Sequence, residues 1–177
     1  WDTSKVTSMQ LMFQECLVLP TLDVGDWNTG NVTSMGGMFR GAYALQALDV
    51  GDWDVSKVEN FSQIFASGHQ NWGDMKFTTL DVSNWDAHSA TEMQGMFCGC
   101  TGLKTLDVSG WDTSNVTNMS LMFYRDYNLE YVDVSGWDVS KVTAMNHMFS
   151  SDHQNKSDMA LTSIDVSNWN PVSVTNM

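Results

Sequence analysis

The chain has 177 residues and a formal net charge of −13, with 21 acidic against 8 basic side chains. A surface that binds nucleic acid or an anionic membrane needs clustered Lys and Arg, so this balance argues against both partners. The longest apolar run, Cys16–Leu19, is far shorter than the ~20 residues of a membrane-spanning helix. With 42% hydrophobic residues and only 2 Pro, the composition is that of a folded chain.

Tryptophan recurs along the whole chain with a regular spacing, and Asp or Asn follows it each time. The positions are Trp1, Trp27, Trp53, Trp85, Trp111, Trp137 and Trp169, so that successive sequence numbers differ by 26, 26, 32, 26, 26 and 32. The two long intervals recur with an 84-residue period and contain matching six-residue insertions. We therefore expect a single array over 1–177, with an 84-residue super-repeat (1–84 and 85–168) and a partial repeat at 169–177. Because the array starts and stops within a unit, we expect it to be a fragment of a longer protein.

Each unit predicts the same short elements in chain order. A Trp-(Asp/Asn)-x-Ser turn comes first, as at 1–4, where the acidic or amide oxygen can accept the backbone N–H two residues on. Alternating apolar and polar residues predict a short strand around 6–9, and the Met-x-x-Met-Phe run at 9–13 predicts one helical turn. The apolar-Asp-apolar sequence at 22–24 predicts a second short strand.

A 26-residue unit cannot bury its apolar side alone, so neighbouring units must stack on it. Strands of adjacent coils would then lie ~4.8 Å apart, and each inward column would become a ladder of Leu, Val, Met or Phe. The sequence therefore predicts a repeat solenoid of six to seven coils, with two short β-strands and one short helical turn per coil. Every third coil is expected to be a longer, 32-residue coil.

The repeat unit also resembles a known family. Leu106–Met119 reads L-D-V-S-G-W-D-T-S-N-V-T-N-M and is followed by Met122-Phe123, which resembles the bacterial surface protein 26-residue repeat family. More distantly, the order Phe97, Cys100, Leu103 is similar to BspA-type leucine-rich repeats. The resemblance implies a leucine-rich-repeat-like solenoid that is extracellular or on a cell surface and acts in adhesion. It supplies no catalytic residues to carry over.

One aspartate per coil lies on the outward side of the strand predicted at 22–24. The row consists of Asp23, Asp49, Asp81, Asp107, Asp133 and Asp165. Like charges ~5 Å apart repel. In one interpretation each carboxylate accepts hydrogen bonds within its own turn, with lysines such as Lys5, Lys57 and Lys141 nearby. In the other, the row supplies oxygen ligands for Ca²⁺, together with a second row, Asp54, Asp86, Asp112 and Asp138.

The two insertions form a second candidate site, because loops on a rigid scaffold are where recognition residues gather. Their polar and aromatic residues are His69, Gln70, Asn71, Trp72 and Asp74 in the first, and His153, Gln154, Asn155 and Asp158 in the second. They suggest binding of a metal or a sugar, with Trp72 able to stack on a sugar ring. The alternative is that the insertions are solvated bulges without a ligand, copied by duplication.

Three minor features complete the candidates. Glycosylation sequons, which matter only in a eukaryotic secretory pathway, lie at Asn31, Asn60, Asn115, Asn118 and Asn155. An outward Thr column allows an ice-binding hypothesis, although Glu59 interrupts it. The three cysteines are expected to be buried free thiols.

The sequence contains no recognisable catalytic motif, so we expect no enzymatic activity and no cofactor other than Ca²⁺. Two functions of different class remain. The first is a surface module that binds a protein or glycan partner, as the family resemblance favours. The second is a structural element of a filament, sheath or cell coat, assembled with copies of itself or other coat proteins through the periodic insertions and stabilised by calcium. The 84-residue period favours this alternative, and neither involves nucleic acid or membrane insertion of this segment.

Overall fold

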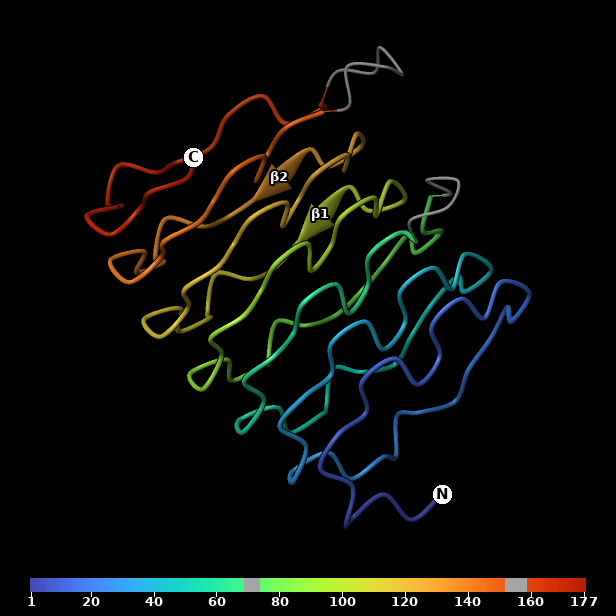
Figure 1. Cartoon of the computed structure of the whole chain (residues 1–177). Coiled ribbons are helices and arrows are strands. Elements are labelled where there is room, and N and C mark those ends of the chain that lie inside the picture. The colour runs from blue at the N-terminus through green and yellow to red at the C-terminus, as the bar shows by residue number, and fades with distance from the viewer. Residues whose placement is uncertain (69–73, 152–158) are drawn as a thin grey trace.

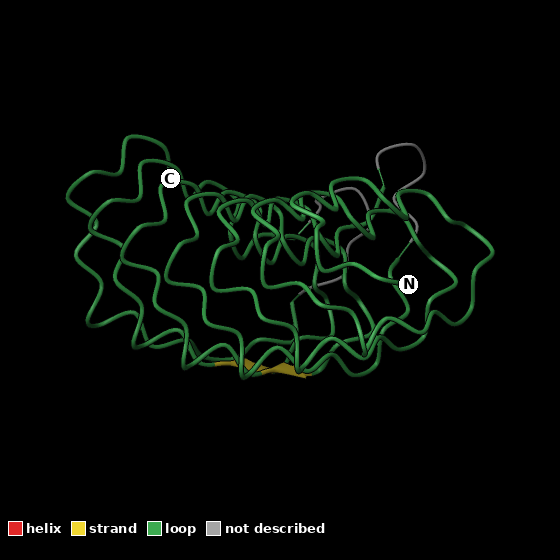
Figure 2. Cartoon of the chain, turned by 90° about the horizontal axis from the view of Figure 1, so that it is seen from below, coloured by secondary structure: helices red, strands yellow, loops and turns green. Residues whose placement is uncertain are grey.

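The chain winds through successive coils that are displaced along one direction from the N-terminus to the C-terminus (Figure 1). This computed structural model describes residues 1–68, 74–151 and 159–177. Two strands, β1 (Thr105–Leu106) and β2 (Tyr131–Val132), pair in parallel, with Thr105 opposite Tyr131. They lie at one edge of the stack of coils (Figure 2). The described ranges contain no helix.

Parallel bridges connect one extended residue of each coil to its equivalent in the next coil. The bridged residues are, in order, Ser8, Ser34, Asn60, Glu92, Asn118, Ala144 and Asn176. Successive partners have the same spacing as the tryptophans of the sequence, with a longer step where a coil carries an insertion. The repeat of the sequence is therefore also the repeat of the backbone, although the strand expected around 6–9 is reduced to single bridges.

The Met-x-x-Met-Phe segment differs from the expected helical turn. In the first coil the N–H groups of Met9, Leu11, Phe13 and Glu15 each donate to a carbonyl of the next coil, at 2.8 to 3.0 Å. The intervening N–H groups turn back within the coil, as from Met12 to the carbonyl of Met9. This path requires positive φ at Leu11 (60°) and Glu15 (56°). Hydrogen bonds between coils thus replace helical bonds within a coil, and they offset the roughly 1 kcal/mol that a left-handed residue costs.

Two ladders of aromatic rings run through the core. The phenylalanine ladder comprises Phe13, Phe39, Phe65, Phe97, Phe123 and Phe149, with 5.3 to 5.9 Å between the centroids of neighbours. It crosses the first insertion without a break, because Phe65 and Phe97 stack at 5.8 Å. Tryptophans form the second ladder, as where Trp111 and Trp137 stack at 6.4 Å. Offset stacks at this separation add to the stabilisation from burial alone.

Each buried tryptophan also makes a hydrogen bond to the preceding coil. The indole N–H of Trp111 donates to the carbonyl of Val82 at 3.0 Å. The same bond recurs at Trp53, Trp85, Trp137 and Trp169. A buried indole needs such a partner. The column therefore contributes both apolar area and a bond that fixes the register between coils.

Candidate functional site

An aspartate projects from each of four successive coils and accepts hydrogen bonds from the serine two residues later. The Oδ1 atom of Asp107 accepts the N–H of Ser109 at 3.2 Å and its O–H at 2.8 Å. Asp81 and Asp133 accept the same pair of bonds, and Asp165 accepts the serine N–H. The prediction that these carboxylates are held by donors in their own turns is confirmed for these coils. We call the four residues the strand aspartates.

The serine bonds favour the charged form of the strand aspartates. The serine hydroxyl and then its N–H lower the pKa of Asp81 and Asp133, and the N–H and then the hydroxyl lower the pKa of Asp165. Repulsion from Asp165 acts against this shift at Asp133. Asp81, Asp133 and Asp165 are therefore ionised at neutral and mildly acidic pH.

In the first two coils, the aspartates of this row have different neighbours. Asp23 and Asp49 are exposed, and Gly25 and Gly51 follow them where later coils have serine. These glycines lack the hydroxyl that the later serines donate. A side chain at Gly25 would meet the Oδ2 atom of Asp49 at 2.9 Å, so the carboxylate of Asp49 leans towards the preceding coil.

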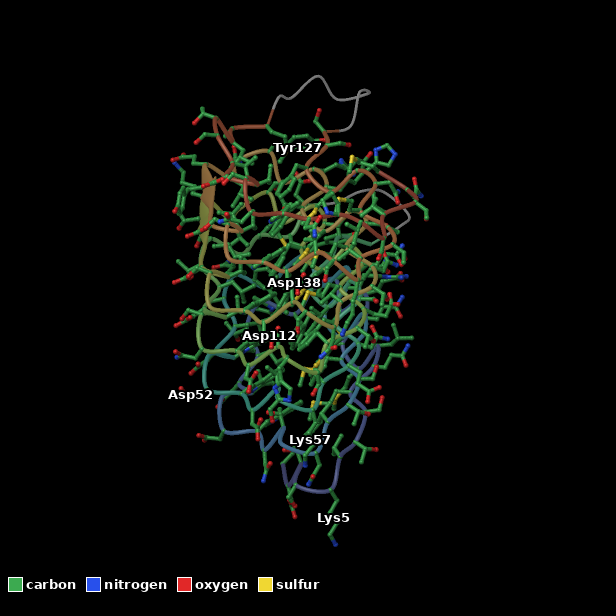
Figure 3. The ribbon with its side chains drawn as sticks, turned by 90° about the vertical axis from the view of Figure 1, so that its left-hand side faces the viewer. Lys5, Asp52, Lys57, Asp112, Tyr127 and Asp138 are labelled. Atoms are coloured by element: carbon green, nitrogen blue, oxygen red, sulfur yellow. The ribbon has the colours of Figure 1, made fainter. Side chains whose placement is uncertain are left out.

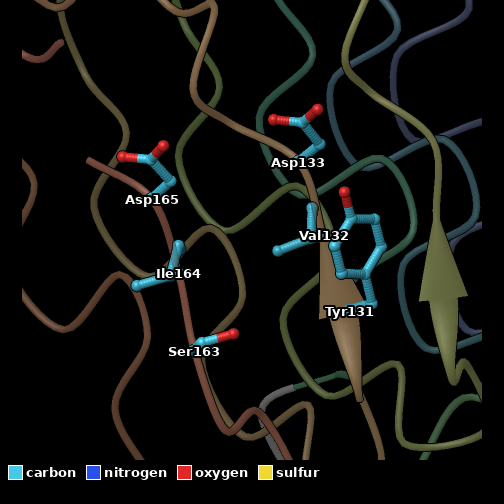
Figure 4. A pocket seen from close by; sticks show the side chains of 6 residues that line it. All are labelled: Tyr131, Val132, Asp133, Ser163, Ile164 and Asp165. Carbon is cyan, nitrogen blue, oxygen red and sulfur yellow. The ribbon is translucent and has the colours of Figure 1, made fainter. Parts of the chain in front are cut away.

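Three grooves run between the coils that carry the strand aspartates. The groove beside β2 is lined by Tyr131, Val132, Asp133, Ser163, Ile164 and Asp165 (Figure 4). In the second groove Thr105 and Asp107 occupy the positions equivalent to Tyr131 and Asp133. In the third groove Thr79 and Asp81 occupy them. Tyr131 is 59% exposed. We call residues 78–83, 105–109, 131–133 and 163–165 the grooved face; it combines carboxylates, hydroxyl groups and one exposed aromatic ring.

A second row of aspartates follows the tryptophans and lies on another side of the stack. Asp54, Asp112 and Asp138, the turn aspartates, each accept the N–H of the serine two residues on, as the Asx-turn prediction requires. Asp112 and Asp138 lie one above the other, and Lys57 lies farther down the same side (Figure 3). Lys57 and Lys141, which were expected near the first row, act on aspartates of this second row.

Those two lysines contribute to the turn aspartates instead. After the larger effect of the serine hydrogen bonds, Lys57 helps to lower the pKa of Asp54, and Lys141 does so for Asp112 and Asp138. In the same row Asp86 lies 2.8 Å from the ring Nδ1 of His88. The second row therefore has basic neighbours within the chain.

The sequon asparagines at the start of the Asn-Val-Thr motif are engaged within the fold. Asn31 donates from Nδ2 to the carbonyl of Ser4, and Asn115 to that of His88, both at 2.9 Å. Lys57 and Lys141 donate to the Oδ1 atoms of the same asparagines. Asn60 and Asn118 accept a backbone N–H through Oδ1, whereas Asn155 lies outside the described residues.

The described residues do not assemble a metal centre. Within 1–68, 74–151 and 159–177, no three or more Asp, Glu, His or Cys side chains are close enough together to hold a metal ion. The calcium hypothesis for Asp23, Asp49 and the strand aspartates would therefore require ligands from elsewhere, such as backbone carbonyls or a partner.

The insertion residues singled out by the sequence lie mostly outside the described residues. These are His69, Gln70, Asn71, Trp72, His153, Gln154, Asn155 and Asp158. Asp74 is described and exposed. The two ends of the first insertion lie against one neighbouring residue, because Ser67 packs beside Gly99 and the Met75 N–H donates to the Gly99 carbonyl at 3.1 Å.

The outward threonines use their hydroxyl groups within the stack. Each donates from Oγ1 to a carbonyl of the preceding coil: Thr33, Thr91, Thr117, Thr143 and Thr175. This internal bonding explains the column without an ice surface.

Sequence reasoning missed a buried polar cluster beside the first insertion. Asp126 is 2% exposed and accepts the Cys100 N–H at 2.7 Å, and its burial raises its pKa well above the usual value. Cys98 and Cys100 are buried free thiols, as expected, whereas Cys16 is a free thiol that is only partly buried; burial raises the pKa of Cys98 to about 12. The signal in the sequence was Arg125-Asp126 where the three preceding coils have Gly41-Ala42, Ser67-Gly68 and Gly99-Cys100. Tyr131 was missed too, in a column otherwise occupied by Thr, Ser and Ala.

The stacked equivalent residues and the regular bridge register define a protein built of tandem repeats. The family described as "Mycoplasma protein of unknown function, DUF285" matches residues 1–79 and 69–177, which together span the chain. The chain belongs to this family. No curated protein and no solved structure matches it.

The described part of the chain offers no helix with the length and apolar character needed to cross a bilayer.

Proposed function

We propose that this chain is a non-enzymatic repeat module of an extracellular or cell-surface protein that binds a protein or glycan partner through the grooved face. We further propose that its coils form a leucine-rich-repeat-like solenoid of the bacterial surface protein, BspA-like type. Membership of a repeat family and the motif at Leu106–Met119 support this assignment.

The observation that carries the binding proposal is the repetition of one groove at successive coils. Each groove presents a carboxylate oriented by its own turn, together with hydroxyl groups, so a partner with a repeating structure meets the same chemistry several times. Multiple weak contacts of this kind add up to useful avidity. Tyr131 adds a large exposed surface, and tyrosine is enriched where proteins bind partners.

The test compares the wild type with Tyr131→Thr on arrays of immobilised matrix proteins and glycans. Threonine occupies the equivalent position 105, so the fold should tolerate the change. We expect Tyr131→Thr to weaken the strongest array signal by about fivefold or more. The control is His147→Gln, an exposed position where the equivalent residue 63 is glutamine. The proposal fails if no array component binds or if the control loses as much.

The structural alternative retains one supporting observation. The same bond between coils precedes the insertion in both super-repeats: the N–H of Gly41 donates to the carbonyl of Ala66, and the N–H of Arg125 donates to the carbonyl of Ser150. The two insertions therefore start about three coils apart, which suits periodic lateral contacts. Sedimentation velocity in millimolar Ca²⁺ and in excess chelator tests it; calcium-dependent assembly lost on shortening both insertions would favour a coat or filament. A monomer in both buffers would argue against it.

A further inference from the structure

The two aspartate rows differ in how their charge is balanced. The turn aspartates have basic neighbours: Lys57 beside Asp54, and Lys141 beside Asp112 and Asp138. These lysines are held in place, since Lys141 donates to Asn115 Oδ1 at 2.7 Å and Lys57 donates to Asn31 Oδ1 at 3.0 Å. Repulsion within this row is thus offset inside the chain.

The strand aspartates lack this compensation. Among the described residues, no lysine or arginine contributes to the ionisation of Asp81, Asp133 or Asp165, whereas Asp165 does act on Asp133 as a like charge. The nearest basic residue along β1, Lys104, pairs with Glu130 at 3.0 Å. Carboxylates at the ~4.8 Å spacing of neighbouring coils repel one another, and a positively charged partner would relieve that repulsion.

The geometry of the face suits an extended partner. The grooves repeat from coil to coil, and β1 and β2 present Thr105 and Tyr131 side by side between them. Asp133 and Asp165 lie at the same level on neighbouring coils (Figure 4). The ring of Tyr131, exposed in the middle of the face, can accept an ammonium or guanidinium group against its π-surface.

We propose that the partner of the grooved face is an extended basic polypeptide segment, with Lys or Arg side chains seated against the strand aspartates and Tyr131. This inference rests on the proposed function and names the class of its partner. Charge complementarity carries it: a row of fixed, uncompensated carboxylates meets a chain of flexible cations. A neutral glycan would leave the repulsion within the row unrelieved.

The test measures binding of a fluorescent hexalysine peptide by anisotropy. The test variant is Asp107→Asn with Asp133→Asn, because the amide oxygen can still accept both serine bonds. The matched control is Asp112→Asn with Asp138→Asn, which changes the net charge from −13 by the same two units on the other row. We expect the test variant to bind about five- to tenfold more weakly than the control. A six-residue Gly-Ser peptide serves as the neutral probe.

If both variants bind hexalysine more weakly by the same factor, the peptide is attracted by net charge alone and the inference is overturned. The inference is also overturned if neither variant binds hexalysine more weakly than the wild type. If binding to a neutral glycan on the array depends on Tyr131 but the substitutions of Asp107 and Asp133 leave hexalysine binding unchanged, the proposed function stands and the proposal of a basic partner is wrong. Melting temperatures check that the variants fold. Should the test variant unfold, Thr105→Lys places a cation on the face without touching an aspartate and is expected to weaken hexalysine binding too.

Discussion

At the scale of single residues, the coil corner around Gly99 is tightly constrained. Gly99 has φ of 75°, and a Cβ there would lie 2.8 Å from the Cβ of Ser67. Next to it, Asp126 reaches from the following coil to the N–H of Cys100. Both features arise because backbones of adjacent coils approach within hydrogen-bond distance, so a side chain at the corner must fit between two coils.

Substitution of Gly99 by alanine should destabilise the protein by about 1 to 3 kcal/mol, because the new methyl group meets Ser67 and the left-handed conformation disfavours it. Urea unfolding measures the change. Gly110→Ala is the control: its nearest neighbour would be the Ser83 carbonyl at 3.8 Å, an ordinary contact. Equal midpoints for the two variants would contradict the strain at Gly99.

The buried carboxyl of Asp126 should give the stability a distinctive pH profile. Its pKa is raised in the folded state, so the folded form holds a proton that the unfolded chain releases above its pKa of about 3.9. Stability should therefore decrease as the pH rises from about 4 through the folded pKa. The thiols of Cys98 and Cys100 stay neutral in this range, because burial raises the pKa of each.

Asp126→Asn keeps an acceptor for Cys100 but cannot titrate, so its urea midpoint should not decrease between pH 4 and neutrality. Below about pH 4 both proteins should lose stability, because the lowered pKa values of Asp81 and Asp133 mean that their serine bonds are lost on protonation. Superimposable profiles from pH 3 to 8 would refute this assignment.

At the scale of the elements, regular secondary structure is scarce, and columns of side chains take its place. The coil is held by turns at the Trp-Asp and Met-x-x-Met-Phe segments and by bridges at single residues. Each of the buried tryptophans Trp53, Trp85, Trp111 and Trp137 contributes an indole bond and a ring stack to its neighbours. The column thus acts as a structural element, although each of its members comes from a different coil and they lie far apart in the sequence.

Replacing one column member tests this description. Trp111→Phe removes the donor for the Val82 carbonyl and leaves a void, so we expect a loss of about 2 to 4 kcal/mol. Trp1→Phe changes the same side chain where it is 86% exposed, and should alter stability by less than about 0.5 kcal/mol. Thermal unfolding followed by circular dichroism provides the comparison. A loss at Trp1 as large as that at Trp111 would argue against the indole bond.

At the scale of the whole molecule, the bridge and phenylalanine ladders continue past the first insertion. Asn60 bridges Glu92 and Phe65 stacks on Phe97 although the coil between them is longer. Both ends of the insertion meet at Gly99. The insertion therefore adds chain without interrupting the stack.

Deletion of 69–74 should consequently leave a folded protein whose melting temperature changes by only a few degrees. Differential scanning calorimetry gives the melting temperature, and the near-ultraviolet spectrum reports whether the tryptophan stack persists. An unfolded deletion variant would mean that the insertion supports the coils on either side of it.

Periodicity made part of this structure predictable. Equal spacing of Trp, Val and Met positions fixes which residues must stack, and the Asp-x-Ser pattern predicts the turn bonds seen at Asp112 and Asp138. The absence of the expected helical turn was not predictable. The N–H groups of Leu11 and its equivalents donate to carbonyls of the next coil, and these bonds depend on the neighbouring backbone. Tyr131 occurs once in its column, so repetition gave no signal for it, and the burial of Asp126 depends on the packing of neighbouring coils. The effect of Lys141 on Asp112 and Asp138 was not predicted, because spacing alone does not tell which row of aspartates a lysine faces.

Alternate N–H groups of the Met-x-x-Met-Phe segments, such as those of Met9, Leu11 and Phe13, point towards the next coil in the C-terminal direction. Peptide dipoles aligned in this way add, as they do along an α-helix. This side of the stack therefore has an electrical polarity with its positive end at the last coil, whereas the N–H groups of Thr33, Thr91 and Thr117 on another column point to the preceding coil. Two stacks that meet through their Met-x-x-Met-Phe sides are electrostatically favoured in opposite orientations, which is a directional preference that no individual coil possesses.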